Sequence, residues 1–157
     1  MLIPLILLSC IPRAAACDGW IRLSATEVQG QTWRDAAPTK FLSATLDMDG
    51  DGELDVAAIV VSRDSKRSAI RICFGGSERR QQCQIIAVSE NIADVMGLEK
   101  KGPGCYSYAE DDVGRPSRGR QICGRNDMLE YFKFGSAGSF FVYETNRNTL
   151  GRYWGSD

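Results

Sequence analysis

The chain has 157 residues, of which 43% are apolar and 25% charged, and its formal net charge is −1. This balance is typical of one folded domain, and the small net charge gives no reason to expect nucleic acid or an anionic membrane surface as a partner. The sequence contains no histidine, which excludes Ser-His-Asp and Cys-His catalysis and any His-ligated zinc or haem site.

Residues 1–16 are expected to be an export signal. The segment opens with an apolar run that is shorter than the roughly 20 residues needed to span a bilayer. Three alanines, 14–16, then suit signal-peptidase cleavage. The Leu-Leu-Ser before Cys10 resembles a bacterial lipobox, so lipidation of Cys10, or of Cys17, is an alternative. We expect a periplasmic protein in which residues 17–157 form one domain, with membrane attachment only through such an N-terminal lipid.

Four segments in the first two thirds of the chain are typical of strands. Phe41–Leu46 leads into an acidic loop, and the β-branched run Leu54–Val61 leads out of it. Ser68–Phe74 alternates apolar and polar residues as a half-buried strand does, and Cys83–Val88 is similar. The next segment, Ser89–Gly97, is predicted to be one short helix with its serine as N-cap.

The last third of the chain predicts a loop followed by a β-meander. Lys100–Arg125 is rich in Gly, Pro, Ser and charge, as a long loop is. Met128–Phe134, Ser139–Glu144 and Leu150–Trp154 are aromatic strands joined by short turns. The fold expected is mainly β, an antiparallel β-sandwich or open barrel of about seven or eight strands with little helix.

Six cysteines favour an oxidising compartment. Three pairings are open to the four cysteines in the body of the domain, Cys73, Cys83, Cys105 and Cys123. A Cys73–Cys83 bridge would close a hairpin, and a Cys105–Cys123 bridge would connect the ends of a polar loop. We predict these two local bridges. A zinc cluster is disfavoured, because the sequence has no Cys-x-x-Cys pair.

The acidic loop predicts a Ca²⁺ site in a strand-loop-strand frame. Calcium takes six to eight oxygen ligands, which a short loop supplies by alternating ligands with tight turns. Gly52 at position six permits the sharp turn, and Ala58 stands at position twelve, where an EF-hand has a bidentate Glu. The expected ligands are four side chains and, at position seven, a backbone carbonyl: Asp47, Asp49, Asp51, Asp55 and Glu53.

This spacing resembles the Asp-x-Asp-x-Asp-Gly-x-x-Asp loop of FG-GAP/VCBS-type repeats. Those repeats bind calcium between two strands, so the resemblance implies the same ligand set for the loop Asp47–Asp55. It covers this loop and its flanking strands. Because the loop occurs once, the chain cannot form a propeller of such repeats.

The whole chain is similar to a group of small proteobacterial periplasmic proteins. The likeness consists of an export signal, one calcium loop, a cysteine-bearing Gly-rich loop and an aromatic C-terminal segment, Glu130–Asp157. Some members are immunity proteins that inhibit peptidoglycan-degrading effectors, with a β-fold similar to the invertebrate-type lysozyme inhibitors. The Ser-Gly-x-x-Tyr inhibitory loop of those inhibitors does not occur in this chain.

The leading hypothesis is a non-enzymatic, calcium-binding periplasmic domain that binds a cell-wall hydrolase or secreted effector. The long loop would enter the cleft of that partner, with Tyr106 and Tyr108 as anchors. One alternative is a carboxylate-dependent glycoside hydrolase, for which Glu110–Asp112 offers acidic groups. Another is a structural envelope protein that binds carbohydrate.

Overall fold

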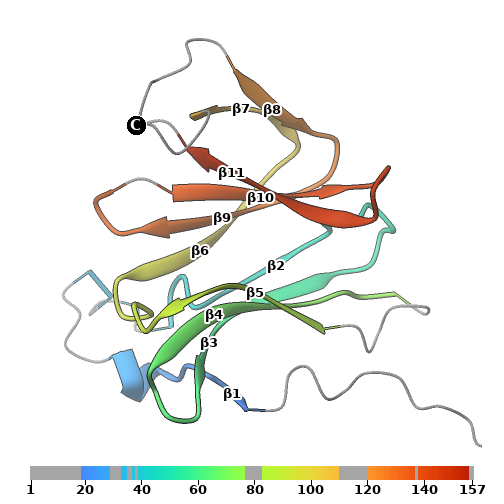
Figure 1. Cartoon of the computed structure of the whole chain (residues 1–157). Coiled ribbons are helices and arrows are strands. Elements are labelled where there is room, and N and C mark those ends of the chain that lie inside the picture. Colours follow the sequence, from blue (N-terminus) through green and yellow to red (C-terminus); the bar gives the residue numbers. More distant parts are fainter. Residues whose placement is uncertain are drawn as a thin grey trace, which may run out of the picture.

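Two antiparallel β-sheets make up almost all of the described structure (Figure 1). The computed structural model describes residues 19–28, 33–34, 37, 39–76, 83–109, 120–136 and 138–155. One sheet is curled into a half-barrel, and no α-helix occurs within these ranges. Within the same ranges, no helix has the length and apolar character to cross a membrane. The mainly-β sandwich or open barrel expected from the sequence is confirmed.

The first sheet has five strands arranged around β3. Short strands β1 and β2 lie beside different halves of the same edge of β3: β1 pairs with residues 60–62 and β2 with residues 55–58. On its other edge β3 pairs with β4, and β4 pairs with β5. The strands, with a 3-10 helix after the first, are β1 (Trp20–Arg22), η2 (Ala25–Val28), β2 (Ser43–Leu46), β3 (Asp55–Ser62), β4 (Arg67–Cys73) and β5 (Cys83–Glu90).

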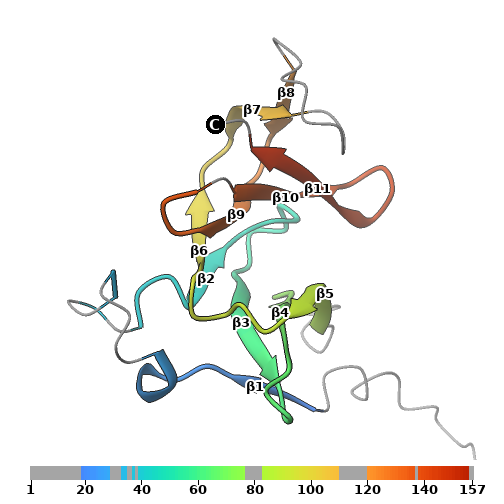
Figure 2. The same ribbon diagram turned by 60° about the vertical axis from the view of Figure 1, so that its left-hand side comes forward.

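The second sheet has six strands in the order β6-β9-β10-β11-β7-β8. Its centre is the aromatic meander β9-β10-β11, as the sequence predicts, and its far end is the hairpin β7–β8 (Figures 1 and 2). The strands are β6 (Met96–Lys101), β7 (Gly104–Ala109), β8 (Gln121–Gly124), β9 (Met128–Lys133), β10 (Gly138–Glu144) and β11 (Thr149–Gly155).

The core lies between the two sheets. In β3 every residue except Val56 is buried, which explains why the strand is a continuous β-branched run rather than an alternating one. Full burial of an aliphatic side chain contributes about 1.5–3 kcal/mol. Six leucine and isoleucine side chains of the core are at most 1% exposed: Leu46, Ile59, Ile70, Ile72, Leu98 and Leu129. Since Leu46 ends β2 and belongs to this group, the core holds the start of the acidic loop in place.

The predicted helix at Ser89–Gly97 does not form. Strand β5 continues to Glu90, and β6 begins at Met96. Between them the Asn91 side chain accepts the Ala93 N–H at 3.2 Å, and the Val95 N–H donates to the Ile92 carbonyl at 3.1 Å. These bonds make a tight turn, and pairing of β6 with β9 stabilises the strand that follows.

The segment Lys100–Arg125 is not a plain loop. It contains β7 and β8, which pair so that Cys105 stands opposite Cys123. With β1 and β6, these strands raise the number described to eleven, above the seven or eight expected. The sequence signal was weak because the Gly, Ser and charged residues of the hairpin have low strand propensity.

Candidate metal site and adjoining cleft

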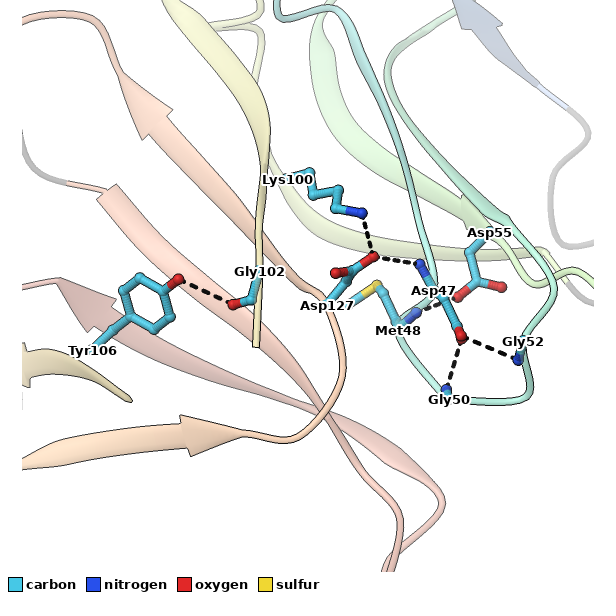
Figure 3. A network of polar contacts seen from close by, with 9 residues as sticks. All are labelled: Asp47, Met48, Gly50, Gly52, Asp55, Lys100, Gly102, Tyr106 and Asp127. Atoms are coloured by element: carbon cyan, nitrogen blue, oxygen red, sulfur yellow. Dashed lines mark hydrogen bonds and ion pairs between the residues drawn. The ribbon is translucent and has the colours of Figure 1, made fainter. Parts of the chain in front are cut away.

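The acidic loop connects β2 to β3 and closes around the carboxylate of its first residue. The Asp47 carboxylate accepts hydrogen bonds from the N–H groups of Gly50 at 2.8 Å and Gly52 at 3.1 Å (Figure 3). Both glycines have positive φ, 76° and 86°, which favours glycine at these turns. The spacing of Asp and Gly residues therefore produces the tight loop that the sequence predicts.

The other carboxylates of the loop also bind backbone N–H groups. Asp49 accepts the Asp51 N–H at 3.2 Å, and Asp51 accepts the Glu53 N–H at 2.8 Å. Asp55, the first residue of β3, accepts the Met48 N–H at 2.8 Å and, from beyond β4, the Gly75 N–H at 2.9 Å. Asp55 thus connects the beginning of the loop to the chain after β4.

Three of these carboxylates converge. Asp47, Asp49 and Asp55 each offer an oxygen, and these oxygens all lie within 4.8 Å of one another. Two ligands of one Ca²⁺, each about 2.3–2.6 Å from the ion, can be no more than about 4.6–5.2 Å apart. The three oxygens therefore fit the coordination sphere of a calcium ion, and carboxylate is the donor type that this ion prefers.

The electrostatics of the cluster favour a bound cation. Asp55 is fully buried, and the pKa of its carboxyl is raised, chiefly by burial and also by the charges of Asp49 and Asp47, although the N–H groups of Gly75 and Met48 lower it. Within the described ranges, neither Asp47 nor Asp55 forms an ion pair with Lys or Arg. Two unit charges 4 Å apart repel by about 4 kcal/mol at an effective dielectric constant of 20, and a divalent cation would replace this repulsion by attraction.

Two predicted ligands lie outside this group of three. The Asp51 carboxylate is directed toward Gly76, whose missing side chain leaves the space that it occupies. Glu53 is exposed, and the sequence assigns a role only to its backbone carbonyl. Asp51 and the Glu53 carbonyl therefore remain predicted ligands, whereas the geometry brings together Asp47, Asp49 and Asp55.

Residues of the second sheet hold the loop, and sequence reasoning missed them. The Asp127 carboxylate accepts the Asp47 N–H at 3.0 Å, and the Asp127 N–H donates to the Asp47 carbonyl at 3.1 Å. The Asn126 amide donates to the Met48 carbonyl at 3.2 Å, and Lys100 on β6 lies 2.7 Å from Asp127 (Figure 3). The pKa of Asp127 lies below its ordinary value. Burial raises this pKa, but Lys100 and the Asp47 N–H together lower it by more than burial raises it.

Both predicted disulfides form. Cys73–Cys83 connects the end of β4 to the start of β5, and Cys105–Cys123 connects β7 to β8. The first bridge is two residues from Gly75, whose N–H binds Asp55. It therefore helps to position one side of the acidic cluster.

The two tyrosines predicted as partner anchors pack within their own sheet. The Tyr106 ring lies 5.3 Å from that of Phe140, and its hydroxyl donates to the Gly102 carbonyl at 3.0 Å (Figure 3). Tyr108 meets the ring of Tyr153 edge-on at 5.3 Å. Both side chains are half-buried, so their contacts stabilise the hairpin.

A cleft of about 690 Å³ adjoins the acidic loop. Met48 of the loop lies on one side, the β8–β9 connection from Arg125 to Asp127 on another, and the β10–β11 turn on the third. Asn126 and Asp127 thus belong both to the contacts that hold the loop and to the cleft wall.

The remaining candidates, Cys10, Cys17 and Glu110–Asp112, lie outside the described residues.

Fold and site together define an all-β domain with two disulfides and an acidic strand-loop-strand unit. No family model matches the chain, and no curated protein or solved structure matches it either.

Proposed function

We propose that the protein is a calcium-stabilised, non-enzymatic binding domain of the periplasm. The observation that supports this most is the convergence of Asp47, Asp49 and Asp55, with no cationic partner among the described residues for Asp47 or for the buried Asp55. The two disulfides fit an oxidising compartment. We also propose that a lipid on Cys10 or Cys17 attaches the protein to the membrane. Metabolic labelling with a fatty acid tests this attachment.

The proposed role of calcium is structural. Asp47, Asp49 and Asp55 would supply three oxygens, and Asp51, the Glu53 carbonyl and water would complete a set of six or seven. The loop contacts Asp127 of the second sheet, so an ion there would stabilise the contact between the sheets. Extracellular modules bind calcium at roughly 10⁻⁴–10⁻³ M, which keeps such a site occupied outside the cytoplasm.

Thermal unfolding of the whole protein in calcium and in chelator tests this role. Calcium at 100 times its Kd should add about 2.7 kcal/mol to the free energy of unfolding. Asp47→Ala should remove the response, whereas Glu53→Gln, which changes only an exposed side chain of the same loop and keeps its backbone carbonyl, should preserve it. A wild-type melting temperature that is identical in calcium and chelator would refute the calcium site.

The partner we propose is a peptidoglycan hydrolase, inhibited by the β7–β8 hairpin. This hairpin ends the second sheet and extends away from the first (Figures 1 and 2). The Cys105–Cys123 bridge links its strands, and rings of β10 and β11 support Tyr106 and Tyr108. Strands that are already held together lose little entropy on binding, which favours β7 and β8 as the binding element.

Inhibition assays against muramidases and amidases encoded near the protein's gene test the partner. The whole protein should suppress lysis by one of them, and replacing both Cys105 and Cys123 by Ser should weaken this inhibition. Lys66→Ala, in the β3–β4 turn, serves as the control and should inhibit normally. Absence of inhibition across these hydrolases would contradict the proposed partner while leaving the calcium site standing.

A further inference from the structure

The cleft beside the acidic loop has a polar lining in which both carboxylates are already paired. The Glu144 carboxylate accepts the Tyr153 hydroxyl at 2.8 Å and lies 3.1 Å from the Arg147 guanidinium. Asp127 is paired with Lys100 at 2.7 Å. With Arg125 also on the wall, the lining holds two carboxylates and two guanidinium groups. A ligand therefore meets fixed donors and acceptors but little net charge.

One glycine leaves the space for the central carboxylate of this lining. Gly151 on β11 pairs with Val142, and a side chain there would collide with the Glu144 carboxylate. Because Gly151 has none, Glu144 reaches across to Tyr153 at the cleft surface. Its side chain is 21% exposed, so the carboxylate is held by the protein and still accessible to a ligand.

We propose that this cleft binds a neutral oligosaccharide. Each sugar hydroxyl both donates and accepts hydrogen bonds. A carboxylate offers two acceptors, a guanidinium two donors and an amide one of each, at the spacing of two neighbouring hydroxyls. Glu144, Arg147 and Asn126 supply one group of each kind. The half-buried ring of Tyr153 offers apolar surface to the C–H groups of a sugar ring.

Other ligand classes fit the lining less well. An apolar peptide side chain needs an apolar pocket, but two of the three aliphatic residues on the wall, Met48 and Val142, are only 1% and 7% exposed, and the third, Ile122, is half-buried. An anionic ligand would be repelled by the carboxylates of Glu144 and Asp127, and this repulsion offsets its attraction to Arg125 and Arg147. A neutral polyhydroxylated chain incurs neither cost.

The acidic loop should influence this site. Asn126 and Asp127 hold the loop through the Met48 carbonyl and the Asp47 backbone, and they also form one wall of the cleft. Ordering of the loop should therefore order this wall. Only this link rests on the proposed calcium site, because the pairs of Glu144 with Tyr153 and Arg147 do not involve the loop.

The test is an NMR titration of the whole protein with neutral tetrasaccharides: the β-1,4 tetramer of N-acetylglucosamine, cellotetraose and maltotetraose. At least one should give saturable shifts at residues 124–127 and 143–147. Glu144→Gln and Arg147→Ala should each weaken that binding about ten-fold, as expected for loss of a hydrogen bond to a charged group. Lys66→Ala, in the β3–β4 turn of the first sheet, should bind as the wild type does.

The outcomes separate the two proposals. If no tetrasaccharide binds at about 10 mM, or if Glu144→Gln and Arg147→Ala leave binding unchanged, the oligosaccharide site is wrong. Binding of short peptides at the same residues in place of sugars would also overturn it. Sugar binding that is equal in calcium and chelator would support the cleft and refute its link to the loop.

Discussion

The Asp127 carboxylate accepts a hydrogen bond from the Asp47 backbone N–H at 3.0 Å, across 80 residues of sequence. A second bond, from the Asp127 N–H to the Asp47 carbonyl at 3.1 Å, completes a two-way contact. Asp47 begins the acidic loop of the first sheet, and Asp127 immediately precedes β9 of the second. The candidate metal site is therefore built on one sheet and held by the other.

Asp127→Ala should destabilise the protein by about 1–3 kcal/mol, because it leaves the Asp47 N–H without its acceptor. Lys100→Ala removes only the ion pair, with a lysine side chain that is 49% exposed, and should cost about 0–1 kcal/mol. Urea unfolding of both variants measures the difference. Equal losses would mean that the ion pair, rather than the bond to the loop, is what stabilises this contact.

Gly50→Ala and Gly52→Ala should differ although they lie in one loop. Both residues have positive φ, so either alanine should cost about 1–2 kcal/mol. A side chain at Gly50 would also collide with Asn126, whereas one at Gly52 would meet nothing within 4 Å. Displacing Asn126 from the Met48 carbonyl should cost about 1 kcal/mol more.

A double-mutant cycle checks this reasoning. In an Asn126→Ala background the excess cost of Gly50→Ala over Gly52→Ala should disappear, since the colliding group is gone. Chemical denaturation gives all the required free energies. An excess that persists without the Asn126 side chain would argue against the collision.

The two disulfides should contribute similarly to stability and differently to calcium binding. Replacing either cysteine pair by alanine should cost about 2–4 kcal/mol. Only removal of Cys73–Cys83 should also reduce the stabilisation by calcium, because that bridge positions Gly75 against Asp55. Melting curves with and without calcium measure both effects. The same calcium response in both variants would show that the bridge does not support the site.

Tyr131→Phe should leave stability at neutral pH unchanged or raise it by about 1 kcal/mol. The Tyr131 hydroxyl is buried and has no hydrogen-bond partner within the described residues, so its removal eliminates an unsatisfied group. Burial also raises the pKa of the phenol, although Arg152 opposes this. The wild type should therefore keep its full stability below about pH 10, the pKa of an unfolded tyrosine, and lose some above it.

Unfolding measured between neutral and alkaline pH compares the two proteins. The phenylalanine variant should lose less stability than the wild type as the pH rises through the folded pKa of Tyr131. A variant that loses as much would show that this phenol does not contribute to the alkaline loss. A large destabilisation at neutral pH would mean that the hydroxyl has a partner.

Features encoded within a few neighbouring residues were predictable from the sequence. The Asp and Gly spacing of residues 47–55 predicts a tight loop whose carboxylates face inward, because side chains bind backbone N–H groups two to five positions away. The two bridges and the aromatic meander were predictable for a related reason. In each, short segments fold back on their immediate neighbours.

Features that depend on pairing between distant segments were decided by the tertiary structure. Residues 89–97 carry signals for a short helix, but pairing of β6 with β9 outweighs that local preference. No local pattern marks Asn126 or Asp127, since their partners Met48 and Asp47 are reached only when the sheets pack together. The cleft has the same origin. The sequence by itself determined the acidic loop and the carboxylates that it carries, and only the packing of two sheets decided what holds that loop and which surface lies beside it.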